Sequence, residues 1–157
     1  MGQSKFVSTP YDELTYKIIG CAMASHRGLG PGLREDTYQR DLEVHLARAG
    51  LALEAQKLFE VYDSLGGGGL IGYYIPDFVI DEKVIVEIKA VNGLNNNHLA
   101  QVISYLAVSG NPLGLLINFG ERSLRYRRIL PPQKVIDHQV THQWLFIPDW
   151  LKNESDK

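Results

Sequence analysis

The chain has 157 residues and a formal net charge of -2 at pH 7. This length suits a single domain over residues 1–157 with a proper core, and the composition is that of an ordinary globular protein. The slightly acidic balance argues against a strong non-specific polyanion binder but leaves room for a local basic patch. No apolar run approaches the roughly 20 residues that span a membrane, and the N-terminus lacks a signal-peptide core, so we expect a cytoplasmic protein without membrane contact. Cys21 is the only cysteine, which excludes an internal disulfide.

The first third of the sequence predicts two helices. Residues 9–12 combine a threonine hydroxyl with a proline and an acid, which is typical of a capped helix start. The glycine-rich residues 28–32 are expected to end this helix. Residues 34–49 predict a second helix, whose buried stripe contains Tyr38, Leu42 and Leu46.

Strands are expected from residue 53 onwards. Residues 53–62 predict one strand, and residues 66–69 predict a flexible glycine loop before the next strand. Two apolar, β-branched runs, residues 75–80 and 84–89, flank a short charged turn, which predicts a β-hairpin.

Three charges lie inside the apolar runs of this hairpin: Asp77, Glu87 and Lys89. If the turn is centred on Glu82, Asp77 faces Glu87, and two like charges that face each other repel. A divalent cation between the carboxylates turns that repulsion into binding energy. Hard cations such as Mg²⁺ favour carboxylate oxygens and keep waters and phosphates as other ligands. A lysine beside such a water can position it or stabilise negative charge.

The spacing Glu-x-Lys also occurs on the wet face of ordinary amphipathic strands, so an alternative without function exists. Because side chains alternate along a strand, Glu87 and Lys89 share one face with Ile85. The other face carries Val84, Val86 and Ile88. A strand that is apolar on both faces is expected to be central and covered, which favours a functional site.

The rest of the chain predicts a helix over residues 97–108, a buried strand over residues 113–119 and an edge strand over residues 124–129. The expected order is two helices, three strands, a helix and two strands. We expect a core over residues 11–129 and a C-terminal extension over residues 130–157.

A basic cluster lies around the predicted edge strand and consists of Arg122, Arg125, Arg127 and Arg128, with Tyr126 among them. Bases can stack on such a tyrosine while arginines take phosphates. Alternation along the strand splits the cluster between two faces, and positive charge also protects an edge strand from aggregation. We favour the second interpretation.

The pattern resembles the PD-(D/E)XK nuclease superfamily. Pro76-Asp77 precedes Glu87-Ile88-Lys89 with the spacing of that motif, and the order of elements agrees. The resemblance implies an α/β fold with a restriction-endonuclease-like core, in which helices flank a mixed central sheet in the order helix-strand-strand-strand-helix-strand.

Two further motifs narrow the resemblance. Gly32, Glu35 and Tyr38 have the spacing of the GxxExxY branch of the superfamily. Gln101 and Tyr105 match the Gln-x-x-x-Tyr motif of its RecB-like nucleases. They lie one helical turn apart and therefore share a face of the helix.

The resemblance implies roles for several residues. Asp77 and Glu87 would be metal ligands, Ile88 would offer its backbone carbonyl to the metal, and Lys89 would be the catalytic lysine. For Glu35 two readings stay open: a further acid at the metal, or a solvated glutamate favoured by the helix dipole.

The helix residues have alternatives of their own. Gln101 and Tyr105 would contact the substrate backbone or Lys89, whereas the alternative is a capping polar residue and a core tyrosine. We favour function for Gln101 more than for Tyr105. His98 is expected to be a polar surface residue, and Tyr38 a packing residue that helps to place Glu35.

The expected function is Mg²⁺- or Mn²⁺-dependent hydrolysis of phosphodiester bonds in nucleic acid, expected to be DNA, with a protein partner or a homodimer supplying affinity. The rival from another class is a non-catalytic nucleic-acid-binding or regulatory module that retains the nuclease fold. A third possibility is metal-dependent hydrolysis of another phosphate ester, because a fold alone does not fix the substrate. The motifs leave the choice between endo- and exonucleolytic cleavage open.

Overall fold

The computed structural model describes residues 8–136. Within this range the elements follow one another as α1 (Asp12–Leu29), α2 (Glu35–Arg48), β1 (Leu53–Ala55), β2 (Phe59–Tyr62), β3 (Leu70–Tyr74), β4 (Phe78–Ile80), β5 (Val84–Lys89), α3 (Asn96–Ser109), β6 (Leu113–Asn118) and β7 (Arg125–Ile129). Five of these strands form one sheet in the order β1-β4-β5-β6-β7. The β5–β6 pair is parallel and the other pairs are antiparallel, so the sheet is mixed, as predicted.

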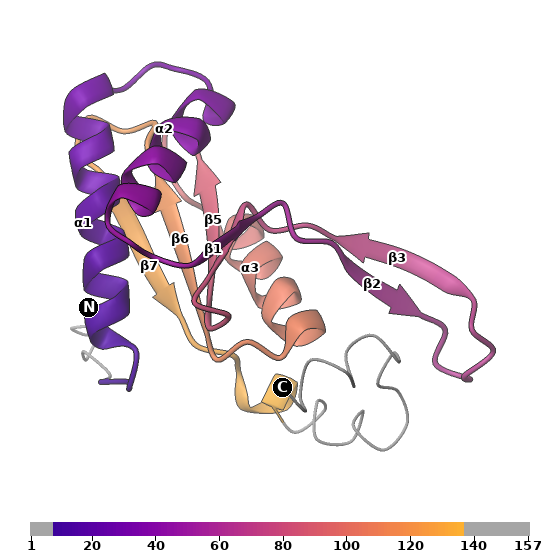
Figure 1. Ribbon diagram of the computed structural model, residues 1–157. Coiled ribbons are helices and arrows are strands. Elements are labelled where there is room, and N and C mark those ends of the chain that lie inside the picture. The colour runs from indigo at the N-terminus through magenta and orange to yellow at the C-terminus, as the bar shows by residue number, and fades with distance from the viewer. Residues whose placement is uncertain (1–7, 137–157) are drawn as a thin grey trace.

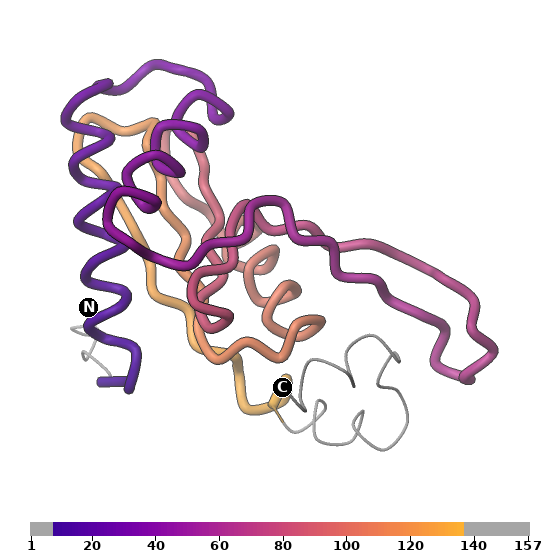
Figure 2. Tube along the Cα trace, viewed as in Figure 1, coloured from indigo at the N-terminus to yellow at the C-terminus, as the bar shows by residue number. Residues whose placement is uncertain are grey.

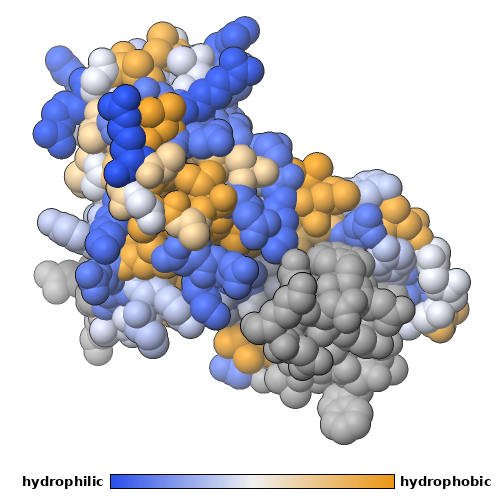
Figure 3. All heavy atoms as spheres, viewed as in Figure 1, coloured by the Kyte–Doolittle hydropathy of each residue, from blue (hydrophilic) through white to orange (hydrophobic). Residues whose placement is uncertain are grey.

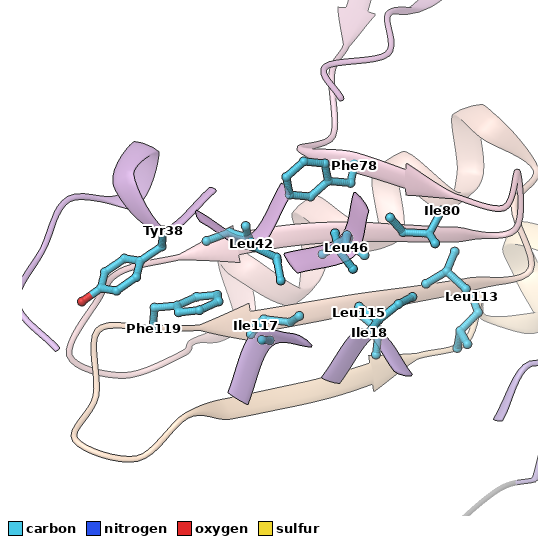
Figure 4. Close-up of a cluster of buried hydrophobic side chains, with 14 residues drawn as sticks. Ile18, Tyr38, Leu42, Leu46, Phe78, Ile80, Leu113, Leu115, Ile117 and Phe119 are labelled. Carbon is cyan, nitrogen blue, oxygen red and sulfur yellow. The ribbon is translucent and has the colours of Figure 1, made fainter. Parts of the chain in front are cut away.

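Two helices cover one face of the sheet (Figure 1). Ile18 of α1 and Leu42 and Leu46 of α2 point at the central strands, because their helical spacing places them on one apolar stripe. On the sheet side they meet alternate residues of β5 and β6, among them Val86 and Ile117, which are fully buried. Figure 4 shows this core from the side, with Tyr38 and Phe119 at one end of it.

The third helix, α3, covers the opposite face. Its Val102 and Leu106 pack on Ile85 and Leu116, which alternate with the residues of the first core along the same strands. Gly114 permits the close approach, since a β-carbon there would lie 2.5 Å from Cγ1 of Val102. Strand β5 is therefore central and covered on both faces, as predicted.

The continuous strand predicted over residues 53–62 is wrong. Gln56 adopts a left-handed φ of 55°, which ends β1 and turns the chain out of the sheet. Strand β2 then pairs with β3 in a separate two-stranded ribbon. This ribbon, which we call the arm, extends away from the sheet (Figures 1 and 2).

The tip of the arm is organised around one carboxylate. Asp63 accepts hydrogen bonds from the backbone N–H groups of Leu65, Gly67 and Gly69, at 3.1, 3.0 and 2.8 Å. These bonds lower the pKa of Asp63. Hydrophobic side chains lie at the surface of the arm (Figure 3), including Ile71, which is 67% exposed.

The predicted order of three strands before the third helix is also wrong, because residues 53–89 form five strands. The other predicted elements agree with the structure to within three residues at their boundaries. The expected threonine cap of α1 is wrong: Asp12 turns back and accepts hydrogen bonds from the backbone N–H and the hydroxyl of Thr9, both at 3.0 Å. Strand β7 lies at an edge of the described sheet, as predicted. Most of the C-terminal extension, residues 137–157, lies outside the described residues. No helix in the described part is long and apolar enough to cross a bilayer.

Candidate functional site

The hairpin of β4 and β5 has the register predicted from the turn. Ile80 is opposite Val84, so Asp77, one residue before β4, lies level with Glu87. Two hydrogen bonds join these positions: the Asp77 N–H donates to Oε2 of Glu87 at 3.4 Å, and the Ile88 N–H donates to Oδ2 of Asp77 at 2.7 Å. The two carboxyl groups therefore lie side by side at the end of the central strand.

Both carboxyl groups are buried, with 8% of Asp77 and 4% of Glu87 exposed. Burial raises the pKa of Asp77 to about 6; the Glu35 carboxylate adds to the rise, and the Ile88 hydrogen bond opposes it. Burial also raises the pKa of Glu87 to about 8, and here the Asp77 carboxylate adds to the rise. Two acids that resist ionisation in this way favour a cation between them.

Lys89 completes the predicted set. Its Nζ lies 3.7 Å from Oε1 of Glu87, and only 15% of its side chain is exposed. Strand alternation places Lys89 on the same face as Glu87, with Ile88 on the opposite face in the first core. Asp77, Glu87 and Lys89 are thus brought together as the sequence predicted, and the backbone of Ile88 runs between them.

Glu35 is the first residue of α2 and is half-buried. It lies near enough to raise the pKa of both Asp77 and Glu87. Yet among residues 8–136 no group of three or more His, Cys, Asp or Glu side chains is placed to hold a metal ion. The structure therefore brings Glu35 to the edge of the site without joining it to the other two acids.

The oxygen-only donor set of Asp77 and Glu87 fits a hard divalent cation. A Mg²⁺ ion commonly takes one or two carboxylates and completes its coordination with waters and substrate phosphates, so two protein carboxylates are sufficient. The raised pKa values of the pair are the observation that favours such an ion, because a cation relieves the repulsion that raises them.

Gln101 and Tyr105 lie on α3 beside the acids. Nε2 of Gln101 donates to the Tyr105 hydroxyl at 2.9 Å. Burial raises the pKa of Tyr105 to about 12, and the Glu87 carboxylate contributes to this rise. Tyr105 is 6% exposed and meets Tyr74 edge-on, with ring centroids 6.1 Å apart. Gln101 therefore does not cap the helix, and Tyr105 joins the second core while its hydroxyl faces the site.

Helix capping at this end of α3 falls to Asn95 and His98 instead. The Asn95 side chain accepts from the backbone N–H of His98 at 3.2 Å, and the Asn95 N–H donates to Nδ1 of His98 at 3.1 Å. Tyr38 is fully buried and stacks on Phe119, with ring centroids 4.9 Å apart. Its hydroxyl binds the linker before α2, so Tyr38 is a packing residue, as predicted.

Gln56 contacts Asp77, and the sequence did not predict this contact. Its backbone N–H donates to the Asp77 carbonyl at 3.1 Å, and its side chain hydrogen-bonds the Asp77 carboxylate. The left-handed φ of Gln56 is uncommon for a residue with a β-carbon and is held by these contacts. A single polar residue between Ala55 and Lys57 carried no signal that distinguished it from an exposed strand residue.

The chain after Lys89 is held by the end of β6. The Asn118 side chain pairs with both backbone groups of Val91, at 3.0 and 2.9 Å, and the Phe119 N–H donates to the Lys89 carbonyl at 2.8 Å. A β-carbon at Gly120 would lie 2.4 Å from the backbone of Val91, so only glycine fits. These residues fix the strand end that carries Lys89.

A family profile described as the PD-(D/E)XK nuclease superfamily matches residues 12–129, which include every element of the fold. The chain belongs to this superfamily. No curated protein sequence matches the chain significantly.

Solved structures resemble this PD-(D/E)XK protein at low identity. The crystal structure of SSO0001 has a TM-score of 0.52 and 18% identity, covering 85% of this chain and 68% of its own. An alkaline exonuclease from Laribacter hongkongensis, LHK-Exo, has a TM-score of 0.44 and 14% identity, with coverage of 85% and 77%. Its complex with dAMP has a TM-score of 0.42 and 16% identity, with coverage of 78% and 73%. At 18% identity the likeness to SSO0001 concerns the fold alone, and it agrees with the mixed sheet and flanking helices described above.

The raised pKa values predict how the metal-free PD-(D/E)XK protein responds to pH. Asp77 and Glu87 bind protons more tightly when folded, with pKa values of about 6 and about 8, than at their ordinary values of 3.8 and 4.5. Their contribution to stability is therefore greatest below about pH 4 and is lost as the pH rises towards 8. Urea unfolding in EDTA should give a lower free energy of unfolding at pH 8 than at pH 5.

The isosteric variant Glu87→Gln is the control for this pH response. It removes the group with the largest rise, so the loss of stability between pH 5 and pH 8 should be clearly smaller in the variant than in the parent. If parent and variant lose the same stability between pH 5 and pH 8, the raised pKa of Glu87 is contradicted.

Proposed function

We propose that this chain is a metal-dependent nuclease of the GxxExxY branch that hydrolyses phosphodiester bonds in DNA. The observation that carries the proposal is the buried pair Asp77 and Glu87, whose raised pKa values accompany a lysine 3.7 Å from one of the carboxylate oxygens. Membership of the nuclease superfamily supports the reaction class. The spacing of Gly32, Glu35 and Tyr38 supports the branch.

Asp77 and Glu87 would hold a Mg²⁺ or Mn²⁺ ion, with the Ile88 carbonyl as a further oxygen ligand. PD-(D/E)XK nucleases generally use divalent metal ions, so this assignment agrees with the family. When bound, the ion supplies an activated water and neutralises negative charge on the phosphate. Glu35 lies at the edge of the site. Its negative charge would attract the metal ion, and it would contact the ion through a bridging water.

Lys89 has a defined part in this scheme. Its ammonium carries three N–H donors, and its ion pair with Glu87 holds it at the acids. The remaining donors can orient the attacking water or bind a non-bridging phosphate oxygen, where negative charge grows in the transition state. The burial of the lysine strengthens this interaction because little bulk water screens it.

Gln101 and Tyr105 would bind the substrate. The Gln101 amide uses one N–H for the Tyr105 hydroxyl and keeps another N–H and its carbonyl oxygen for a nucleotide. Burial and the Glu87 carboxylate raise the pKa of Tyr105, which keeps the hydroxyl protonated and able to donate a hydrogen bond to phosphate.

The test is a cleavage assay with removal of the metal. The purified protein is incubated with labelled single-stranded, double-stranded and branched DNA and with RNA, in Mg²⁺, in Mn²⁺ or in EDTA. We expect cleavage of DNA with either metal and none in EDTA, because the proposed reaction takes its activated water from the bound metal ion.

The same assay separates the rival functions. Binding of nucleic acid without cleavage in any metal would favour a non-catalytic module that retains the fold. Hydrolysis of a small phosphate ester, with the nucleic acids left intact, would favour the third possibility. Cleavage that continues in EDTA would contradict the proposed dependence on metal.

A further inference from the structure

The two faces of β7 differ in their surroundings. Ile129 packs in the second core with α3, so alternation places Arg127 and Arg125 on that same face of the sheet. Arg128 lies on the other face, where its Nη1 pairs with Oδ1 of Asp12 in α1 at 2.8 Å. The basic cluster is therefore split between the two faces, as the sequence predicted. Arg125 and Arg127 lie on the face covered by α3, which is also the face of Glu87.

Strand register relates these arginines to the acids. Glu87 of β5 is level with Leu116 of β6, which is level with Arg127 of β7. In the same way Lys89 is level with Asn118, which is level with Arg125. Residues level with each other across a sheet point to the same side, so both arginines project from the sheet face that carries Glu87 and Lys89.

They also lie at the same end of the sheet. Strands β5 and β6 are parallel and end at Lys89 and Asn118, whereas β7 runs in the opposite direction and begins at Arg125. Helix α3 packs closely on the start of β6, where Val102 would meet a β-carbon on Gly114. Arg125 and Arg127 are exposed, so solvent reaches them on this face.

The distance between β5 and β7 suits a nucleic-acid strand that contacts both. Two strand spacings of about 4.8 Å put the backbone of β7 roughly 10 Å from that of β5. The rise of about 3.4 Å per nucleotide along the helix axis is the lower limit for the spacing of neighbouring phosphates on one strand, so roughly 10 Å spans at most about three nucleotides. Arginine is well suited to such contacts because its planar fork binds phosphate through two parallel hydrogen bonds.

We propose that Arg125 and Arg127 form a phosphate-binding subsite for the substrate strand, within about three nucleotides of the scissile bond. This inference rests on the proposed function, because it takes Glu87 and Lys89 as the place of cleavage. Nε of Arg125 lies 4.0 Å from Oε1 of Glu121, and Asn118 donates to the other oxygen of that glutamate at 2.8 Å. Glu121 thus orients Arg125, and its long ion pair leaves the guanidinium free to bind phosphate as well.

The test measures binding separately from cleavage. Fluorescence anisotropy in EDTA gives the Kd for a labelled DNA oligonucleotide between about 50 and 200 mM salt. Arg125→Ala and Arg127→Ala should each raise Kd about three- to tenfold, equally for different sequences, and lower the salt slope by about 0.7 to 0.9. Arg40→Ala is the control, because it removes the same charge from an exposed position on α2, which covers the opposite face of the sheet. This variant should keep the Kd and the salt slope of the parent.

A second measurement locates the subsite. One phosphate at a time is replaced by a neutral methylphosphonate along the oligonucleotide. One replacement within about three nucleotides of the cleavage site should weaken binding by the parent but not by Arg127→Ala, which is the coupling expected of a direct contact. Equal losses for parent and variant at every position would overturn the assignment.

The outcomes separate this inference from the proposed function. If the parent binds and cleaves DNA while both arginine variants keep its Kd and salt slope, the subsite is wrong and the nuclease stands. If the parent binds DNA through the arginines but does not cleave, the subsite stands and the proposed hydrolysis is wrong. A parent that binds no nucleic acid would overturn both.

Discussion

Asp77→Asn is expected to abolish metal-dependent cleavage while making the metal-free protein more stable. The substitution removes one of the two carboxylates proposed to hold the metal, and a bound metal contributes several kcal/mol to charge stabilisation in the transition state. A loss of about 4 kcal/mol corresponds to a rate reduction of about 10³-fold. The initial rate of DNA cleavage in Mg²⁺ measures this effect.

The gain in stability has a separate cause. Asp77 is 8% exposed and lies beside Glu87, so its charge at pH 8 is unfavourable in the folded state. Asparagine removes the charge, keeps an oxygen that can accept from the Ile88 N–H and places an amide N–H group beside Glu87. Urea unfolding in EDTA at pH 8 should show a free energy of unfolding higher by roughly 1 kcal/mol or more.

Asp81→Asn is the matched control on the same hairpin. Asp81 lies exposed in the turn between β4 and β5, where its backbone has a positive φ that asparagine also tolerates. This variant should cleave like the parent. Normal cleavage by Asp77→Asn, or equal losses in the two variants, would contradict a specific role for Asp77.

Lys89→Ala is expected to lower the cleavage rate by roughly 10²- to 10³-fold, the usual effect of removing one donor that stabilises developing charge. The ion pair with Glu87 is lost as well, so the Glu87 pKa should rise further and the rate should fall most steeply at low pH. A pH–rate profile of the variant beside the parent measures both effects.

Lys83→Ala provides the comparison for Lys89. Lys83 is exposed at the opposite end of the same strand, directly before β5 begins. Removing it changes the net charge by the same amount and should leave the rate unchanged. If Lys83→Ala and Lys89→Ala lose activity to the same degree, the effect is one of overall charge, and a specific role for Lys89 is contradicted.

The arrangement of Asp77, Glu87 and Lys89 could be predicted because the residues that determine it lie close together in the sequence. The apolar runs around Asp77 and Glu87 are joined by a short turn, so the register follows from counting residues on either side of Glu82. Alternation then fixes the faces of Glu87 and Lys89 without knowledge of distant parts of the chain. The buried stripe of α2 was predictable for the same reason, since helical periodicity is also local.

The errors arose where distant contacts decide the conformation. Gln56 takes a left-handed backbone because Asp77, twenty-one positions later, binds both its N–H and its side chain. Nothing in the sequence around Gln56 indicates that break, so the arm was not predicted. The Thr9 cap failed similarly, because Asp12 binds Thr9 and also pairs with Arg128 from the far end of the fold.

The order of the strands bears on the interpretation of the basic cluster. Alternation alone splits Arg125 and Arg127 from Arg128, and this favoured a purely protective edge strand. The order of strands adds what the sequence lacked, because it places β7 two strands from β5 with its first residue level with Lys89. The function suggested by the residues of one strand therefore depends on which strands lie beside it in the sheet.

The central claim is that Asp77 and Glu87 together bind a divalent cation, and calorimetric titration of Mn²⁺ into the metal-free protein tests it most directly. Titrations in buffers of different ionisation enthalpy also count the protons released. We predict saturable binding with release of protons near pH 7, because the metal requires carboxylates whose pKa values are raised to about 6 and about 8. Binding should be lost in Asp77→Asn and kept in Asp81→Asn. No binding by the parent, or equal binding by parent and Asp77→Asn, would contradict the account.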